Sequence, residues 1–386
     1  MRVLYLVSAC VPTSGGLAAL GICKELRRQG IEAEILTTDA YVEDCSTIVP
    51  YGPTDVDGVP VHYTHSPFLH KYALSWDLTW WLRKNLHSYD LVHIDAFFSY
   101  AILPTVYYAG KIKMPYILRP AGALNQFSLR RNPLRKKLHL YFLSRRLVEG
   151  AAAMHFTSQR EKGEAAYLGN NTRGVVIPLG VDDIYSQLPI SGKFREKYPL
   201  TGDKKIILFL SRIDPKKGLD LLIPALASLR SRYKDFVFVV AGSGDKSFEH
   251  KVKSWVREHG LSDITIFTGF VTGAGKLSVL RDADIFVLSS YDENFGLAVT
   301  EAMASRLPVV VSDQVHIHKE INSYEAGIVT RLNHMEIAEG IETLLKDDSL
   351  RKEMGENGRR LVREKFSWEK IGARLVGLYK SILPRQ

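Results

Sequence analysis

Cysteine is scarce in this sequence. Cys10, Cys23 and Cys45 are the three cysteines among 386 residues. Their number is odd and their spacing matches no zinc motif, so we expect neither a disulfide framework nor a zinc centre. Such low usage fits a reducing compartment such as the cytoplasm. Apolar runs are also short, because none reaches the roughly 18 to 20 residues that a membrane-spanning helix needs.

Motifs for several common functions are missing as well. Ser14-Gly15-Gly16 lacks the G-x-G-x-x-G spacing of a nicotinamide-binding loop, which argues against a dehydrogenase. The net charge of +9 implies an anionic partner, namely nucleic acid, a membrane surface or a phosphorylated substrate. No nucleic-acid-binding signature accompanies this charge, so we expect no nucleic acid partner. Asp282-Ala283-Asp284 spans a predicted helix end and a buried strand, so we interpret it as structural and expect no metal site.

The sequence does contain two successive sets of short buried strands that alternate with helices. In the first set, Val3–Ser8 is a predicted strand, and an amphipathic helix follows from Leu17 to Gln29. In the second set, Ile206–Leu210 is the first strand, after a Pro-Ile-Ser-Gly segment that ends at Gly192. Such alternation predicts parallel, doubly wound sheets, which bind ligands at the carboxyl ends of their strands.

These patterns predict the domain organisation. We place one α/β domain at 1–188 and a second at 189–365, with the two facing a central cleft. We expect the remaining residues, 366–386, to form a C-terminal helix that crosses back to the first domain.

Two glutamates, Glu293 and Glu301, flank a glycine turn at the start of a predicted helix. The unpaired amides of a helix N-terminus bind phosphate, and those of Phe295, Gly296 and Leu297 would lie there. Carboxylates accept hydrogen bonds from sugar hydroxyls. Amides that donate hydrogen bonds to phosphate, between two carboxylates that accept them from hydroxyls, indicate a nucleotide-sugar site. The spacing of the two glutamates alone would also fit a solvated helix face.

A basic loop, Ser211–Gly218, follows the buried strand Ile206–Leu210 and so lies at the carboxyl end of that strand. Arg212 offers a planar fork for phosphate oxygens, and Lys217 offers a point charge. Together they could neutralise a diphosphate leaving group. The alternative is a solvated basic loop without a ligand.

The order of these motifs resembles the family 4 retaining glycosyltransferases of GT-B fold, and the likeness covers nearly the whole chain. The motifs are Ser-Arg-x-x-x-x-Lys-Gly from Ser211, Gly269-Phe270-Val271, and Glu-x-Phe-Gly-x-x-x-x-Glu from Glu293. Further matching segments are the glycine loop Ala9–Gly16, the strand end Val92–Asp95, Thr157–Glu161 and Ile177–Asp182. The resemblance implies two Rossmann-like domains and a glycosyltransferase that retains anomeric configuration and needs no cofactor besides its nucleotide-sugar substrate.

The resemblance also implies a role for each matching residue. Arg212 and Lys217 would hold the donor diphosphate, and Glu293 would bind hydroxyls of the transferred sugar. Glu301 would accept from the ribose. The implied catalytic residues are Glu293, Arg212 and Lys217. The implied donor-binding residues are Gly15, Gly16, Arg212, Lys217, Phe270, Val271, Asn294, Phe295, Gly296, Leu297 and Glu301.

At one position the sequence departs from the family. Many members carry a histidine near the transferred sugar, where the segment Arg119-Pro120-Ala121-Gly122 has an alanine. Arg119, Asn125 or His93 could take over this role, or the role could be absent here.

The resemblance leaves the substrates open. On family frequency we expect UDP-glucose as donor and a glycan or polyprenyl-diphosphate-linked acceptor, in exopolysaccharide or envelope polysaccharide biosynthesis. The alternatives are a GDP-mannose-dependent mannosyltransferase and a GT-B-fold nucleotide-sugar epimerase.

Two segments bear on membrane contact. Residues 130–146 are densely basic with one apolar helical face, which is typical of helices on anionic membranes but also of helices docked on their own domain. Trp76, Trp80 and Trp81 fit a lipid or sugar platform, or buried aromatics. We expect a cytoplasmic protein, peripheral on the inner face of the plasma membrane if 130–146 binds lipid.

Overall fold

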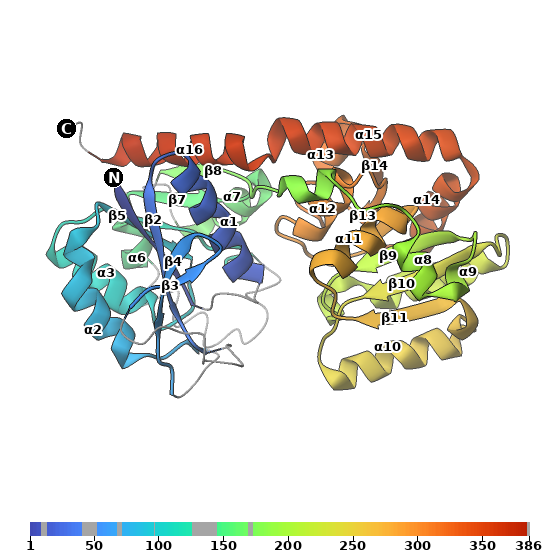
Figure 1. The fold of residues 1–386 in the computed structure, drawn as a ribbon, viewed down its shortest axis with the longest axis horizontal. Coiled ribbons are helices and arrows are strands. Elements are labelled where there is room, and N and C mark those ends of the chain that lie inside the picture. Colours follow the sequence, from blue (N-terminus) through green and yellow to red (C-terminus); the bar gives the residue numbers. More distant parts are fainter. Residues whose placement is uncertain are drawn as a thin grey trace. The chain divides into compact units, whose positions relative to one another are not determined.

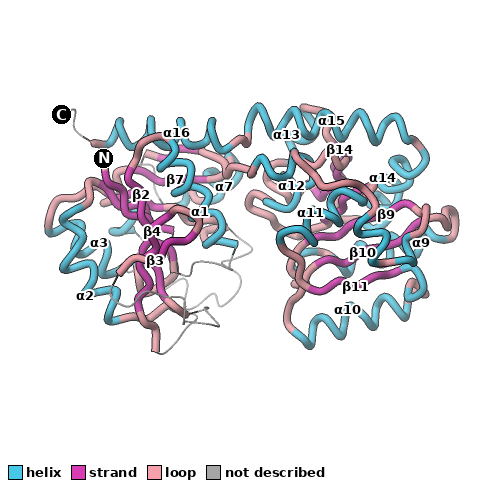
Figure 2. Tube along the Cα trace, viewed as in Figure 1, coloured by secondary structure: helices cyan, strands magenta, loops and turns pink. Residues whose placement is uncertain are grey.

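The chain folds into two compact units (Figure 1). The computed structural model describes residues 1–8, 14–40, 52–67, 72–95, 97–125, 145–168 and 173–383. Unit 1 comprises Met1–Gly180 with Trp368–Gln386, and unit 2 comprises Val181–Ser367. Each unit is built on a mostly parallel sheet with helices beside it, which confirms the predicted α/β class with two Rossmann-like domains (Figure 2).

Unit 1 contains an eight-stranded sheet with the order β3-β4-β2-β1-β5-β6-β7-β8. The strands are β1 (Arg2–Val7), β2 (Glu32–Thr38), β3 (Thr54–Val56), β4 (Val59–Thr64), β5 (Leu91–Asp95), β6 (Tyr116–Leu118), β7 (Ala153–Phe156) and β8 (Gly174–Val176). The described α-helices are α1 (Ser14–Arg28), α2 (Trp76–Asn85), α3 (Ile102–Lys111), α6 (Arg145–Glu149), α7 (Gln159–Glu164) and α16 (Trp368–Ile382). The β3–β4 pair is antiparallel, and the other paired strands run parallel.

The C-terminal helix α16 packs on unit 1 through close contacts that need glycine. The Trp368 ring lies between Gly21 of α1 and Gly180, where an added Cβ would come within 2.3 Å and 2.1 Å of ring atoms. Farther along α16, the Tyr379 hydroxyl hydrogen-bonds the His93 ring in β5 at 2.8 Å. The last helix of the chain is therefore part of the first unit.

Unit 2 contains a six-stranded, all-parallel sheet with the order β11-β10-β9-β12-β13-β14. The strands are β9 (Lys205–Leu210), β10 (Phe236–Ala241), β11 (Thr265–Gly269), β12 (Ile285–Leu288), β13 (Val309–Ser312) and β14 (Gly327–Thr330). The α-helices are α8 (Lys193–Lys197), α9 (Leu219–Arg230), α10 (Lys246–Glu258), α11 (Gly273–Asp282), α12 (Leu297–Ala304), α13 (His318–Ser323), α14 (His334–Lys346) and α15 (Asp348–Lys365).

The central strands of unit 2 form its core. Every residue of β10 is buried, and in β9 every residue except Lys205, at the start of the strand, is buried. Helices on both faces of a parallel sheet shield each strand from water, which explains why these segments are apolar runs rather than alternating patterns. The loops that follow these strands then emerge from a rigid base.

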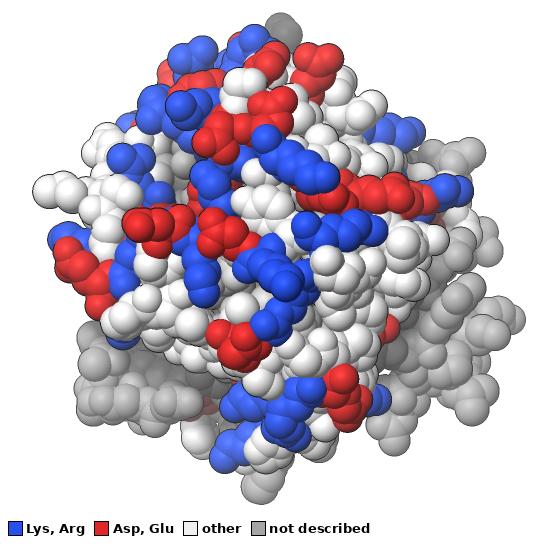
Figure 3. Space-filling model, turned by 90° about the vertical axis from the view of Figure 1, so that its right-hand side faces the viewer, with Lys and Arg blue, Asp and Glu red and all other residues white. Residues whose placement is uncertain are grey.

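The surface carries both signs of charge. On the face in Figure 3, Lys and Arg side chains are interspersed with Asp and Glu. Among the described helices, none combines the length and the apolar character that a membrane crossing requires.

Candidate active site

The candidate site of unit 2 lies where the sheet reverses its strand order. Strands β9 and β12 are parallel neighbours, with Ile207 opposite Ile285 and Leu208 opposite Phe286. Going outward from this pair, the chain proceeds to β10 and β11 on one side and to β13 and β14 on the other. In open α/β sheets such a switch point opens a crevice at the carboxyl ends of the strands, where ligands bind.

The basic loop after β9 is docked against the loop after β12. Gly218 has a φ of 72°, and a Cβ there would lie 1.9 Å from the Ser289 carbonyl oxygen. The Ser289 hydroxyl donates to the Gly218 carbonyl at 2.7 Å, and the Tyr291 amide donates to the Lys216 carbonyl at 2.8 Å. These contacts, which only glycine permits, fix the turn that presents Lys217.

Lys217 and Glu293 form an ion pair across the switch point. Their side chains are 11% and 18% exposed, so both charges are partly withdrawn from water. The Glu293 backbone is held as well, because its amide donates to Gln314 and its carbonyl accepts from His316, at 3.1 and 2.9 Å. The structure therefore brings together these two predicted residues.

Arg212, the third residue with a predicted catalytic role, lies in the same loop as Lys217. It is exposed, and its guanidinium has no ion-pair partner among the described residues. The loop itself is anchored on its other side, since the Ile213 amide donates to the Ser243 carbonyl at 2.9 Å. Arg212 thus combines a fixed backbone with a side chain that is available to an anion.

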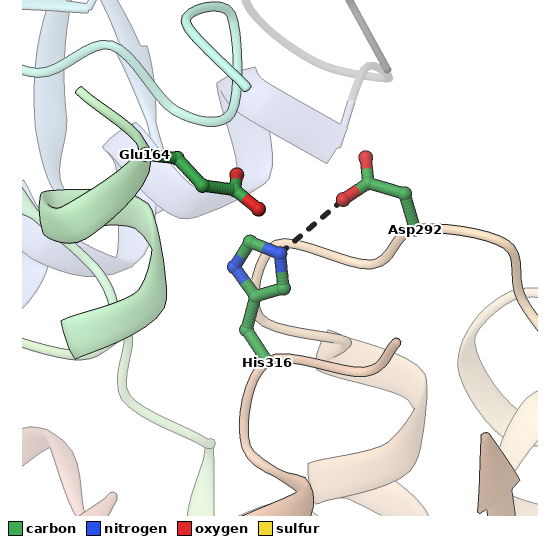
Figure 4. Close-up of side chains that lie close together, drawn as sticks. All are labelled: Glu164, Asp292 and His316. Carbon is green, nitrogen blue, oxygen red and sulfur yellow. Dashed lines mark hydrogen bonds and ion pairs between the residues drawn. The ribbon is translucent and has the colours of Figure 1, made fainter. Parts of the chain in front are cut away.

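A second charged cluster lies next to this pair, and the sequence patterns did not indicate it. The buried Asp292 carboxylate accepts from Lys216 Nζ at 2.5 Å. It also accepts from His316 Nε2 at 3.2 Å (Figure 4). Burial alone would raise the pKa of Asp292, but these two partners hold it below its ordinary value. The charged Asp292 braces the segment that carries Glu293.

Helix α12 begins at the predicted glycine turn. Gly296 is its N-cap residue and has a φ of 80°, which a residue with a Cβ adopts only with strain. The Val299 and Thr300 amides donate to the Gly296 carbonyl at 2.9 and 3.1 Å. The Leu297 and Ala298 amides precede this first helical bond, so they belong to the donors that a helix N-terminus leaves for a ligand.

Asn294 and Phe295 directly precede Gly296 in the chain. Phe295 is buried, and its ring packs edge-on against Phe366 with 5.3 Å between centroids. Its predicted contribution to a ligand is therefore limited to its backbone. Asn294 lies between Glu293 and Phe295 in the chain. Only 18% of the Glu293 side chain is exposed.

Glu301 lies farther along α12 and forms a separate ion pair with a lysine. Its carboxylate pairs with Lys276 Nζ of α11 at 2.7 Å, and Lys276 also lies over the Tyr185 ring at 5.2 Å. Burial and the hydrogen-bonded Glu301 carboxylate both raise the pKa of the Tyr185 hydroxyl. No motif indicated Lys276 or Tyr185, because neither lies in a matching segment.

Two of the implied donor-binding residues, Phe270 and Val271, lie at the end of β11. Phe270 follows this strand with 67% of its surface exposed, and Val271 is half-buried. Gly269 precedes them with a φ of 71°, and its carbonyl accepts from the Gly242 amide at 2.8 Å. The loops after β10 and β11 therefore support each other, with an aromatic ring facing solvent beside them.

In unit 1, Gly15 and Gly16 lie in the first turn of α1. Ala121, at the family's histidine position, has a φ of 49°, and Gly122 follows with 79°. The Arg119 guanidinium is 3% exposed and pairs with Asp95.

Asn125 and His93 are buried as well. Both ring nitrogens of His93 are hydrogen-bonded, to Tyr379 and to His155. The candidate replacements for the missing histidine are therefore engaged with the protein's own groups. The predicted basic helix at 130–146 lies outside the described residues as far as position 144.

Two family models match the chain, one in each unit. The model of the glycosyl transferase 4-like domain matches residues 15–180, and the model of glycosyl transferases group 1 matches residues 191–361.

The curated relatives are glycosyltransferases as well. An uncharacterised glycosyltransferase of Methanocaldococcus jannaschii is 27% identical over 95% of this chain and 94% of its own. A phosphatidyl-myo-inositol mannosyltransferase of Mycobacterium leprae is 29% identical over 61% of this chain and 60% of its own.

Among solved structures, the Anabaena protein HepE, crystallised with UDP and glucose, superimposes with a TM-score of 0.81. The two share 19% identity over 99% of this chain and 100% of that one, so this likeness concerns the fold. Family models in both units, an end-to-end relative and the GT-B fold agree with the motif order, and the chain belongs to the family 4 glycosyltransferases.

Proposed function

We propose that this glycosyltransferase moves a hexose from a nucleotide-diphosphate sugar, with UDP-glucose as the donor, to a glycan or polyprenyl-diphosphate-linked acceptor. The observation that carries this proposal is the Lys217–Glu293 pair at the switch point of unit 2, beside the Gly296 turn. A cation for phosphate, a carboxylate for hydroxyls and open helix amides meet there within one short stretch of surface.

In this proposal the protein itself supplies the positive charge that stabilises the leaving group. Departure of a nucleoside diphosphate builds negative charge on its β-phosphate. Lys217, the exposed Arg212 and the N-terminal amides of α12 would stabilise that charge. The reaction would then proceed without a divalent metal, and chelators would leave it unchanged.

The proposed reaction retains anomeric configuration by attack on the face that the phosphate leaves. The bond between sugar C1 and the β-phosphate oxygen breaks, and a bond forms between C1 and the acceptor oxygen. The acceptor proton passes to the departing phosphate oxygen, so the products are a glycoside and a nucleoside diphosphate. Glu293 would hold hydroxyls of the transferred sugar during this step.

The choice of sugar has two supports that point in different directions. HepE, which has the same fold, was crystallised with UDP and glucose, and this supports UDP-glucose as the proposed donor. The mycobacterial mannosyltransferase is closer in sequence over the part that it matches, which favours GDP-mannose as the second candidate.

We propose further that the acceptor is presented at an anionic membrane, within envelope or exopolysaccharide biosynthesis. The support is the basic, one-sided pattern of residues 130–146 and the relative named for a phosphatidylinositol acceptor. The protein would then work as a cytoplasmic enzyme, peripheral on the inner membrane face.

A donor screen tests the proposal. Purified protein is incubated with UDP-, GDP- and ADP-sugars without acceptor, in EDTA, and both released nucleoside diphosphate and altered sugar nucleotide are recorded. Slow release of UDP from UDP-glucose is the expected result. Release from GDP-mannose would select the mannosyltransferase, interconversion of donors without release would indicate an epimerase, and dependence on added metal would contradict the proposed charge stabilisation.

A further inference from the structure

Unit 1 exposes a concentration of large apolar side chains on one helix pair. They belong to α2, to α3 and to the residues next to these helices: Tyr72, Trp76, Trp80, Leu103, Tyr107 and Ile112. Trp76 and Trp80 are 63% and 64% exposed, and Tyr107 is 57% exposed. Single exposed apolar residues are ordinary, but a group of them on adjacent elements marks an interaction surface. We call these six residues the aromatic patch.

Both helices have the same arrangement of residues along their exposed side. In α2, Trp76 and Trp80 are followed by the exposed Arg83 and Lys84. In α3, Leu103 and Tyr107 are followed by the exposed Lys111. A spacing of three or four residues places side chains on one helical face, so each helix has an apolar stripe that ends in basic residues.

The basic residues lie against the aromatic rings. The Arg83 guanidinium lies 5.3 Å from the centroid of the Trp80 ring, and Lys111 Nζ lies 4.6 Å from that of Tyr107. This contact keeps each positive charge beside the apolar stripe. Such pairing of an aromatic ring with a cation suits the boundary between hydrocarbon and headgroups.

The two helices are fixed to each other, so the patch is a property of the folded unit. Tyr100, two residues before α3, makes both contacts with α2: its hydroxyl lies 2.8 Å from the Thr79 hydroxyl, and its ring meets the Trp76 ring edge-on at 6.0 Å. On the inner side of α2, Leu78 and Leu82 are buried in the core. The helix thus buries leucines and displays tryptophans (Figure 1 shows α2 beside α3).

We propose that the aromatic patch is a docking surface for an anionic lipid bilayer. Trp and Tyr are the residues enriched at membrane–water interfaces, because their rings suit the headgroup region. The charges around the patch match an anionic surface: within α2 and α3, Arg83, Lys84 and Lys111 are exposed, against one exposed acid, Asp77. Protein interfaces instead are depleted in lysine.

The surface is separate from the donor site, and the inference holds whether or not the proposed donor is right. It also differs from the basic segment 130–146, since its residues lie at 72–113. If both surfaces act together, the protein has two membrane contacts, and two weak contacts give firm attachment where one gives reversible binding.

Vesicle binding tests the inference on the full-length protein without any sugar nucleotide. Co-sedimentation is measured with phosphatidylcholine vesicles that contain phosphatidylglycerol, and with vesicles of phosphatidylcholine alone. The double variant Trp80→Ser/Tyr107→Ser should lose about tenfold in partition coefficient on anionic vesicles. Arg83→Gln/Lys111→Gln should bind anionic vesicles more weakly and flatten the dependence on salt.

A matched control removes exposed apolar side chains elsewhere. Ile190 and Met335 of unit 2 are 83% and 41% exposed, and Ile190→Ser/Met335→Ser should bind vesicles like the wild type. Circular dichroism and UDP affinity of each variant report whether the fold and the donor site survive. Because UDP affinity is measured separately, failure of the donor proposal is distinguishable from failure of this one.

Several results would overturn the inference. Equal binding of the wild type and Trp80→Ser/Tyr107→Ser is one, and equal binding to neutral and anionic vesicles is another. A dimer in light scattering that this variant abolishes, without vesicle binding by the wild type, would assign the patch to a second copy of the chain.

Discussion

At the scale of single residues, the candidate site is held by its own opposite charges. Lys217 pairs with Glu293, Lys276 with Glu301, and Lys216 with Asp292. Each of these six side chains would otherwise be a partly buried, uncompensated charge, which is costly. In our account a donor enters by sharing these partners: phosphate oxygens approach the lysines, and hydroxyls approach the carboxylates.

Glu293 therefore should matter for transfer more than for nucleotide affinity. Removing its carboxylate leaves Lys217 free for phosphate but leaves the sugar hydroxyls without their acceptor. We expect Glu293→Ala to lower transfer on the order of a hundredfold, with nucleoside diphosphate affinity unchanged or slightly higher. Calorimetric titration with UDP and a product assay measure the two effects, and a variant that transfers sugar like the wild type would remove Glu293 from the mechanism.

Lys276 should act as a positioning residue for Glu301. It holds one oxygen of the carboxylate at 2.7 Å, and the Tyr185 hydroxyl is also hydrogen-bonded to this carboxylate. Because each carboxylate oxygen can accept more than one hydrogen bond, we expect the carboxylate held in this way to accept from ribose hydroxyls as well. Lys276→Met should weaken UDP binding by roughly fivefold to tenfold, whereas inorganic pyrophosphate, which has no ribose, should bind as before. Lys276→Arg should restore most of the loss. An equal loss for both ligands would indicate a structural role instead.

At the scale of elements, the docked turn at Gly218 restricts which residue the chain can have at that position. Gly218 and Gly260 both have a positive φ, of 72° and 66°. An added Cβ would strike the Ser289 carbonyl at Gly218, whereas at Gly260 no atom lies within 4 Å.

The two glycines thus form a matched pair for mutation. Gly260→Ala should cost about 1 kcal/mol of unfolding free energy, from backbone strain alone. Gly218→Ala should cost roughly 3 kcal/mol, and it should also weaken UDP binding because Lys217 moves. Urea unfolding and UDP titration of both variants give the comparison; equal costs would mean that the loop after β12 moves aside freely.

The contact between α16 and the sheet of unit 1 should depend on pH. His155 Nε2 donates to the Ile177 carbonyl at 2.7 Å, so His155 Nδ1 accepts from His93 Nε2, and His93 Nδ1 accepts from the Tyr379 hydroxyl. This chain of bonds requires both rings to be neutral. Burial keeps the pKa of His93 well below its ordinary value and lowers that of His155 to about 3.

The sign of the pH effect follows from these lowered values. In the unfolded chain both histidines titrate near 6.5, so below that pH the unfolded state takes up protons that the folded state does not. The stabilisation is complete above pH 6.5 and is lost as the pH falls. At pH 5 the loss should be about 2 kcal/mol for His155, and the lowered pKa of His93 adds to it in the same direction. His155→Gln should show a smaller decline in the urea midpoint between pH 7 and 5; an identical decline would contradict the assignment.

At the scale of the whole molecule, the sequence predicted the fold class because the physical cause is repetitive. Buried parallel strands are apolar throughout and alternate with amphipathic helices, and this pattern recurs along both halves. The β3–β4 hairpin was not expected, although its turn, Asp57-Gly58, has the positive φ pair of 52° and 83° that Asp-Gly favours. Its strands are too short to stand out as an apolar pattern.

The sequence predicted only part of the candidate site, and the reason is a different one. Glu293, Lys217 and Gly296 lie in short motifs at strand ends, so a local pattern indicates them. Lys276 and Tyr185 meet Glu301 only because α11 and the turn before α8 approach α12 in the folded unit. The Trp76 and Trp80 rings, which could equally have been buried, are exposed because Leu78 and Leu82 occupy the inner face of α2.

The most direct test of the whole account is the affinity of unit 2 for a nucleoside diphosphate and its dependence on Lys217. Titration of UDP and GDP into the full-length wild type should give binding to one of them. Lys217→Ala should weaken that binding by about tenfold or more, while Lys234→Ala, an exposed lysine in the turn before β10, should leave it unchanged. If neither nucleotide binds the wild type, or if Lys217→Ala binds as tightly as the wild type, the donor site does not lie where we place it.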